Sequence, residues 1–192
     1  MSAQTNSSGI RDNFIRGTVA NFLQAHIQDG SRLSVVSAFF TIYAYDALKA
    51  WLDRIEHMDF LFGEPRFVRS LDPDKTEKKT FVIDAKGLQL ANALQQKRVA
   101  RECAAWIANK VSVKSMKQSN FLHGKMYHVD NNGVEQAILG SSNFTMHGLG
   151  LSLGNNNVEL NLIVDSNRDR ADLKAWFENR YYSGKHHPMP PA

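Results

Sequence analysis

The sequence is poor in cysteine and in long apolar runs. Cys103 is the single cysteine among 192 residues, so no intrachain disulfide and no cysteine-based zinc site can form. No run approaches the roughly 18 continuous apolar residues of a membrane-spanning helix. The polar start, MSAQTNSSG, lacks the apolar core of a signal peptide. We therefore expect a cytoplasmic protein that does not associate with membranes.

The remaining composition is typical of one globular domain. A chain of 192 residues can bury roughly 70% of its unfolded surface in one core. Hydrophobic residues make up 43% of the sequence and charged residues 22%, both ordinary values. The net charge of +4 and the pI near 9.2 have the sign expected for a polyanion partner. We expect a disordered tail at 1–9, one domain at 10–182 and a tail or linker at 183–192.

Hydrophobic patterning alternates between helices and strands. Apolar residues from Phe14 to Ile27 follow helical spacing and predict a helix from Ile10 that ends at Gly30. The nearly continuous apolar run at 33–40 predicts a core strand. Other predicted helices span 43–56, 86–110 and 169–182, and other predicted strands span 58–62, 67–71, 111–117 and 158–165. With a hairpin within 121–145, this order indicates an α/β sandwich whose mixed sheet of about seven strands is flanked by helices.

Basic side chains gather in two of these elements. Lys97, Arg98 and Arg101 cluster on the polar side of the helix at 86–110, and Lys114 and Lys117 belong to the strand at 111–117. Such residues can follow a nucleic-acid backbone. A solvated helix face is an equally good interpretation of the pattern.

The stretch at 121–145, FLHGKMYHVDNNGVEQAILGSSNFT, is the richest in reactive side chains. Its Asn-Asn-Gly sequence is typical of a turn between antiparallel strands and predicts a hairpin. Because strand side chains alternate faces, His123 and Lys125 should project from one face, and His128 and Asp130 from the other. An imidazole beside an ammonium favours binding of, and attack on, an anionic group. Asp130 is interpreted as structural.

The second strand of the hairpin breaks at Gly140 into Ser141, Ser142 and Asn143. Their hydroxyl, amide and backbone N–H groups can close around the same anion. Phosphate is the anion that we expect to bind at such a corner.

This pattern resembles the signature of the phospholipase D superfamily, which is His-x-Lys, four residues, Asp, then Gly-Ser-x-Asn. The matching positions are His123, Lys125, Asp130, Gly140, Ser141 and Asn143. The resemblance implies that Glu159, in the next strand, orients the catalytic imidazole. The family usually has six residues between the Asp and the Gly, whereas this sequence has nine, residues 131–139, which we interpret as a longer hairpin.

The resemblance also implies a mechanism and a homodimer. In this superfamily two His-x-Lys motifs meet at one site, where one histidine attacks phosphorus and the other protonates the leaving oxygen. Of the seven histidines here, only His123 has a lysine two residues later. The second motif would come from another copy of the chain, and no metal or other cofactor is implied.

The expected substrate class rests on a second resemblance. Single-motif members of the superfamily are typically nucleases, and SAFFTIYAYDAL and FLFGEPRF are similar to the nuclease module at the front of bacterial helicase-type ATPases. No Gly-x-x-x-x-Gly-Lys-Ser/Thr loop is present, so a linked or associated helicase or ATPase would be a separate partner. We expect a nuclease that acts through a phosphohistidine on His123, with DNA favoured over RNA.

Three alternatives remain open. The first is a nucleic-acid-binding module of a helicase system that does not cleave. The second is a phospholipase D-type lipid phosphodiesterase, disfavoured because no amphipathic surface or lipid-sized insertion is evident in the sequence. The third is a zinc hydrolase using His123, His128 and His147, which is remote because the first two should lie on opposite strand faces.

Overall fold

The computed structural model describes residues 8–62, 91–116, 122–182 and 186–188. The strand predicted at 67–71, the start of the helix predicted at 86–110, and Lys117 lie outside the described residues.

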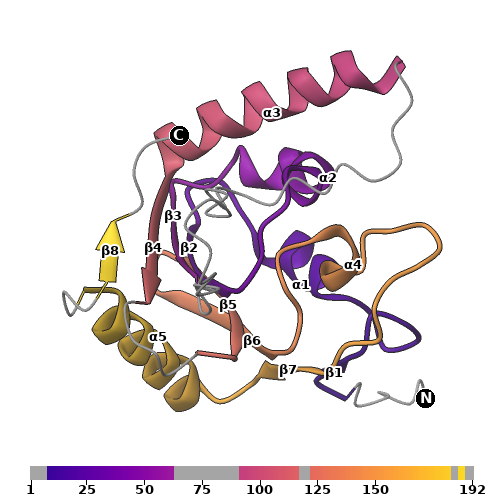
Figure 1. The fold of residues 1–192 in the computed structure, drawn as a ribbon. Coiled ribbons are helices and arrows are strands. Elements are labelled where there is room, and N and C mark those ends of the chain that lie inside the picture. The colour runs from indigo at the N-terminus through magenta and orange to yellow at the C-terminus, as the bar shows by residue number, and fades with distance from the viewer. Residues whose placement is uncertain (1–7, 63–90, 117–121, 183–185, 189–192) are drawn as a thin grey trace, which may run out of the picture.

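Within these ranges one mixed sheet of eight strands forms the centre of the protein, in the order β1-β7-β6-β5-β2-β3-β4-β8 (Figure 1). Strands β2, β3 and β4 run parallel, and the other neighbours pair antiparallel. The strands are β1 (Ile10–Arg11), β2 (Arg32–Ser37), β3 (His57–Phe62), β4 (Val111–Met116), β5 (Lys125–Asn131), β6 (Val134–Gly140), β7 (Asn161–Val164) and β8 (His186–Pro188).

Helices cover both faces of this sheet (Figure 1). One face carries α1 (Val19–His26), α2 (Ile42–Leu52), α3 (Ala91–Lys110) and α4 (Met146–Leu149), and the other carries α5 (Asn167–Tyr182). The larger core lies beneath α1–α4 and includes Leu23, Leu48 and Phe60. A smaller core beneath α5 joins Val36 and Met126 to Phe177.

This architecture confirms the predicted α/β sandwich with a mixed sheet. The strands β1 and β8 have two and three residues and are too short to produce a hydrophobic pattern. The backbone oxygen of Gly9 accepts a hydrogen bond from the N–H of Ile163, and β8 pairs with β4. None of the described helices combines the length and the apolarity needed to cross a membrane.

The helix predicted from Ile10 begins only at Val19. The carboxylate of Asp12 accepts hydrogen bonds from the backbone N–H groups of Phe14, at 2.8 Å, and Arg16, at 3.0 Å. These bonds hold a turn instead of a helix, and Gly17 follows with a φ of +85°, which an α-helix does not accommodate.

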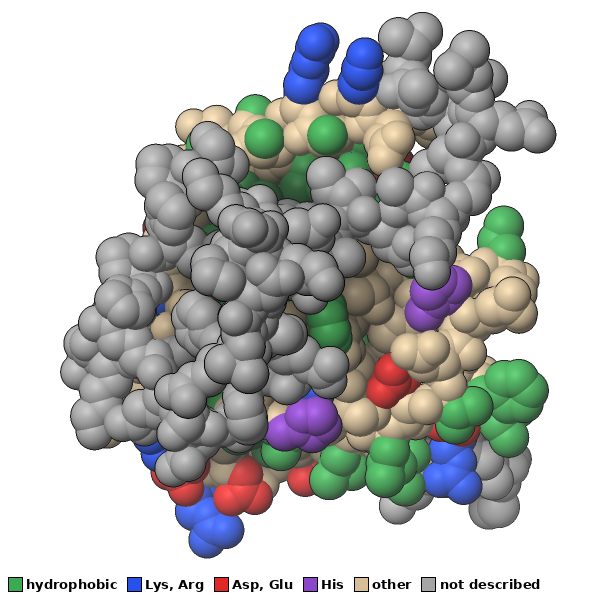
Figure 2. Space-filling view, viewed as in Figure 1, with side chains coloured by type: hydrophobic (Ala, Val, Ile, Leu, Met, Phe, Trp, Pro, Cys, Tyr) green, Lys and Arg blue, Asp and Glu red, His purple; other side chains and the backbone are tan. Residues whose placement is uncertain are grey.

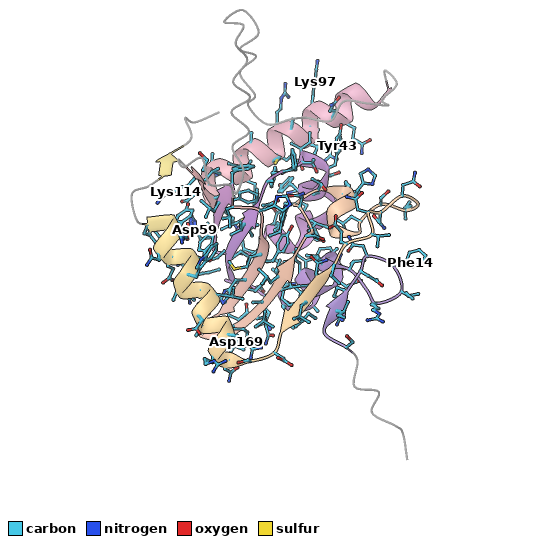
Figure 3. The ribbon with its side chains drawn as sticks, turned by 60° about the horizontal axis from the view of Figure 1, so that its bottom comes forward. Phe14, Tyr43, Asp59, Lys97, Lys114 and Asp169 are labelled. Atoms are coloured by element: carbon cyan, nitrogen blue, oxygen red, sulfur yellow. The ribbon has the colours of Figure 1, made fainter. Side chains whose placement is uncertain are left out.

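Helix α1 starts at a capping box, because the hydroxyl of Thr18 accepts from the N–H of Asn21 while the Asn21 side chain accepts from the N–H of Thr18. Phe14 and Ile15, which helical spacing would bury, are instead 80% and 84% exposed. Figure 3 shows Phe14 projecting from the edge of the fold.

Candidate active site

The hairpin of β5 and β6 carries the candidate site. Asn132 and Gly133, with φ values of 53° and 91°, form a two-residue turn of the kind that matches the twist of paired strands. The register places Lys125 opposite Gly140, and Gly140 opposite Asn161 of β7. The predicted hairpin is therefore confirmed. Its extra residues lengthen both strands, and Lys125 and Gly140 still lie opposite each other at the open end.

Lys125 lies at the start of β5, and His123 lies just before the strand, exposed to solvent. The Lys125 side chain is 5% exposed, and its Nζ donates a hydrogen bond of 2.8 Å to the backbone oxygen of His123. Burying an ammonium is costly unless an opposite charge accompanies it. A bound anion would supply that charge next to the His123 imidazole.

His128 and Asp130 project from the opposite face of β5, toward α5. The Asp130 carboxylate accepts from Lys174 Nζ at 2.7 Å, so it links the hairpin to α5. This ion pair, with its hydrogen bond, lowers the pKa of Asp130. His128 is 1% exposed, and its Nε2 has no hydrogen-bond partner among the described residues.

Burial lowers the pKa of His128, and stability should consequently fall in mild acid. In the unfolded chain His128 binds a proton below pH ~6.5, the unperturbed pKa. In the folded chain it binds this proton only below its lowered pKa, so between these two pH values the unfolded chain carries one more proton. Stability is therefore greatest above this window and decreases as the pH falls through it. Urea unfolding at pH 7.5 and 5.5 should show this loss for the native chain, and a smaller loss for His128→Gln.

The loss attributed to one histidine cannot exceed about 1.4 kcal/mol per pH unit. His147→Gln, a change at an exposed histidine, is the matched control, and the reduction in pH dependence should be larger in His128→Gln than in His147→Gln. The pKa of His26 is also lowered by burial, so His128→Gln should retain some pH dependence. Equal slopes for His128→Gln and the native chain would contradict the assignment.

Gly140 allows β7 to approach the end of β6 closely. A Cβ atom at this position would lie 2.3 Å from the backbone oxygen of Leu160 and 2.6 Å from Cα of Asn161. Any side chain larger than hydrogen would push these residues away. The glycine therefore sets the distance between Ser141 and Glu159 on neighbouring strand ends.

Ser141 and Glu159 form a direct contact at this corner. The Ser141 hydroxyl donates to Oε2 of Glu159 and accepts from the N–H of Leu160 at 3.0 Å. Oε1 of Glu159 accepts from Asn157 Nδ2 at 3.2 Å. The described residues show no hydrogen bond between Glu159 and His123, so the carboxylate is held by Ser141 in this single copy.

Tyr127 lies beneath the same corner. Its hydroxyl donates to the backbone oxygen of Ser142 at 2.8 Å. The pKa of this phenol is raised well above its usual value, first by burial and then by the negative charge of Glu159. The Glu159 carboxylate therefore lies close enough to the Tyr127 hydroxyl to affect its pKa.

Asn143 is oriented by the end of β2. Its Oδ1 accepts from the N–H of Ala38 at 3.0 Å and lies 3.2 Å from the Ser37 hydroxyl, for which the backbone oxygen of Phe39, at 2.7 Å, is a closer acceptor. Because a backbone N–H requires an acceptor, these contacts fix which end of the amide is oxygen. Within the described residues no hydrogen bond uses Nδ2, which leaves both amide N–H groups for a ligand.

The Ser37 hydroxyl also accepts from the N–H of Phe144 at 2.9 Å, and Ser37 is completely buried. Sequence patterning placed it inside an apolar core strand, and its role at the site went undetected. The available signal was the presence of two serines, Ser34 and Ser37, within this apolar run, because a buried hydroxyl needs hydrogen-bond partners.

An open groove of about 560 Å³ runs beside the corner. Ser141 and Glu159 line one part of it, and the remaining lining residues are Ile10, Asp12, Ile15, Arg16, Val158 and Leu160. Figure 2 shows histidine and acidic side chains on one face, with hydrophobic side chains gathered along the lower edge. Among the described residues no group of three His, Cys, Asp or Glu side chains is arranged to hold a metal ion.

The basic residues lie apart from this corner. Lys97, Arg98 and Arg101 are exposed on α3, which packs on α2, and Arg98 pairs with Glu102 at 2.7 Å. Figure 3 shows Lys97 pointing away from the fold. Lys114 donates to the backbone oxygen of Tyr181 at 2.9 Å, and its Nζ lies 4.2 Å from the centre of that ring.

Comparisons with known proteins bear on the family and the fold of this chain. The profile of a family described as "Cardiolipin synthase, PLD-like domain" matches residues 44–181, which include the whole region from His123 to Glu159. The crystal structure of a polyphosphate kinase from Porphyromonas gingivalis is similar, with a TM-score of 0.55 and 10% sequence identity. The similarity covers 90% of this chain and 22% of the kinase chain. A search of curated proteins found no match.

Proposed function

Because the chain belongs to the phospholipase D-like family, we propose that it is a metal-independent phosphodiesterase that cleaves nucleic acid, with DNA preferred to RNA. The observation that carries this proposal is the corner itself. The ammonium of Lys125, the free amide N–H groups of Asn143 and the Ser141–Glu159 pair lie at aligned strand ends beside the exposed His123. Cations and amide donors are the groups that stabilise a phosphoryl transition state.

The reaction would proceed in two displacements. A nitrogen of the His123 imidazole attacks phosphorus, the bond from phosphorus to the leaving oxygen breaks, and that oxygen takes a proton from a second imidazole. Water then attacks the phosphohistidine and gives a proton to the same second imidazole, which restores both histidines. Lys125 and Asn143 would hold the non-bridging oxygens throughout.

The leaving oxygen needs an acid on the side of phosphorus opposite His123, and we infer that this acid is a second imidazole. In phosphoryl transfer the attacking and leaving groups lie roughly in line on opposite sides of phosphorus. One imidazole cannot occupy both positions, and His123 is the one histidine of the sequence within a His-x-Lys motif. We infer that a second copy of the chain supplies the acid, so the active unit is a homodimer in which Glu159 orients the paired imidazoles.

The excess of basic over acidic residues in the chain supports nucleic acid as the substrate. The net charge is +4, and the exposed α3 residues Lys97, Arg98 and Arg101 offer contacts for a phosphate backbone. A linked or associated helicase or ATPase remains a proposed partner. Lipid cleavage is the second candidate, because large apolar side chains such as Val158 and Leu160 are exposed beside the site and the matching family description names a cardiolipin synthase.

The deciding assay compares substrates in excess EDTA. The native chain should cleave plasmid and labelled single-stranded DNA at undiminished rate in the chelator, because no step uses a metal ion. Cleavage of phosphatidylglycerol vesicles but not of nucleic acid would favour the lipid reaction. DNA binding without cleavage would favour the binding module, and activity that EDTA removes would contradict the mechanism.

A further inference from the structure

An exposed phenylalanine lies just beyond the end of β2, beside the candidate active site. Phe39 follows the last residue of β2 by two positions, and it is 46% exposed. A single exposed apolar side chain is ordinary on a protein surface. Phe39 differs from such a residue because it stands next to the groups that can bind an anion.

The strand register places the end of β2 beside Lys125. The pair Val36–Met126 is the last that joins β2 to β5, and both residues lie in the core beneath α5. Ser37 and Lys125 are the next residues of these two antiparallel strands. Because strand side chains alternate faces, both project from the opposite face of the sheet. Two residues of chain span at most about 7 Å, so the backbone of Phe39 stays close to this position.

Contacts on both sides hold the backbone of Phe39. The preceding residue, Ala38, donates its N–H to Oδ1 of Asn143 at 3.0 Å. The backbone oxygen of Phe39 itself accepts from the Ser37 hydroxyl at 2.7 Å. The following residue, Phe40, is buried in the larger core. The exposed ring is therefore carried by the same segment that orients the Asn143 amide.

The other exposed aromatic side chains of the described residues lie elsewhere. Trp176 and Tyr182, 37% and 62% exposed, belong to α5, which covers the opposite face of the sheet (Figure 1). Phe14 projects from the edge of the fold (Figure 3). Within the described part of the chain, Phe39 is thus the exposed aromatic ring that adjoins the anion-binding groups.

Resting on the proposed function, we propose that Phe39 is a stacking platform for a base of single-stranded nucleic acid whose phosphate is held by Lys125 and Asn143. Every base has a flat π-face, so stacking on an aromatic ring strengthens the binding of single strands with little dependence on sequence. In a duplex the neighbouring base pairs already cover these faces, and a nucleotide must be unstacked before it can reach such a ring. Phe39 therefore makes the site selective for single strands.

A fatty acyl chain matches this position less well. Phe40 is buried and Ile42 is partly buried against the larger core, so the segment after β2 exposes one ring and not an extended apolar track. An acyl chain gains its binding energy from many CH₂ groups removed from water together. One aromatic ring beside a cation and an amide instead suits a nucleotide, which joins a flat base to a phosphate.

The test is the dissociation constant of the full chain for a labelled single-stranded oligonucleotide, measured by fluorescence anisotropy in EDTA. Every chain in this test also carries His123→Ala, which keeps the DNA intact. Phe39→Ala should raise this dissociation constant at least about fivefold, the low end for the loss of one stacked base. Phe39→Trp keeps an aromatic ring and should bind at least as tightly as the parent chain. For the same sequence as a duplex, Phe39→Ala should change the constant by less than about twofold.

Phe14→Ala is the matched control, because it removes an aromatic ring that is 80% exposed and lies away from the corner. It should leave the dissociation constants for both forms of DNA at the parent values. The melting temperature of each variant checks that the fold is retained.

Single strands bound equally well by Phe39→Ala and Phe14→Ala would overturn the proposal, as would equal losses for single strand and duplex, or a chain that binds no DNA. Binding to phosphatidylglycerol vesicles that Phe39→Ala removes, with DNA binding unchanged, would assign the ring to lipid instead. A native dimer that Phe39→Ala dissociates in sedimentation would assign the ring to the subunit contact. If single strands bind as expected but the native chain does not cleave them, the proposed nuclease fails while the stacking platform stands.

Discussion

Replacing His123 with alanine is expected to lower the rate of DNA cleavage by at least about 10⁴-fold, the scale seen when a nucleophile is removed. No phosphohistidine can form without the imidazole, and the remaining Lys125 and Asn143 only bind the phosphoryl group. His123 is exposed and precedes β5, so the fold should be retained. The initial rate of cleavage of labelled DNA in EDTA tests the first statement, and the melting temperature of the variant tests the second.

His147→Ala is the control for this substitution, because it removes another exposed histidine that the mechanism does not use. Its rate should remain within about threefold of native, an effect of less than ~0.7 kcal/mol. A His123→Ala variant that keeps a tenth of the native rate would exclude the covalent mechanism.

Mixing subunits extends the same test to the shared site. After exchange with excess His123→Ala chains, most native chains would sit in mixed dimers that contain one imidazole. The total cleavage activity of the mixture should fall in proportion to the fraction of native chains in mixed dimers. Full activity in isolated mixed dimers would show that each copy acts alone.

Replacing Gly140 with alanine is the second change with a large expected effect. The new Cβ would meet backbone atoms of Leu160 and Asn161 within 2.6 Å, and backbone cannot swing aside as a flexible side chain can. Overpacking typically costs 1–3 kcal/mol, and we expect at least ~2 kcal/mol here. For a chain of this size that corresponds to a fall in melting temperature of roughly 4–8 °C.

Activity should fall further than stability alone explains, because displacement of β7 moves Glu159 away from Ser141. Gly154→Ala is the matched control, since a Cβ there meets nothing within 4 Å. Its unfolding free energy, from urea titration, should change by less than about 1 kcal/mol. If Gly140→Ala were as stable and active as Gly154→Ala, close packing of β7 on the corner would not be needed.

Features governed by local sequence could be predicted. The Asn132-Gly133 turn specifies its hairpin through backbone conformations that these two residues accept readily. The separation of Lys125 from His128 follows from strand alternation alone. The alternation of helices and strands was sufficient for the fold class.

Features governed by contacts distant in sequence could not be predicted. Helical spacing continued through Phe14 and Ile15, but hydrogen bonds from the Asp12 carboxylate and the conformation of Gly17 overrode it. The contact of Ser141 with Glu159 depends on the register of β6 against β7. The contact between Ser37 and Asn143 joins residues that are 106 positions apart in the sequence, and no local pattern encodes it.

The long hairpin suggests a practical use of its far end. Seven-residue strands rise about 3.3 Å per residue, so Gly133 lies roughly 20 Å from Lys125 and Gly140. Because the turn closes in two residues and faces solvent, additions there extend outward while the paired strands stay in register. A fluorophore or affinity tag inserted at this turn should leave the corner at the other end of the hairpin unchanged.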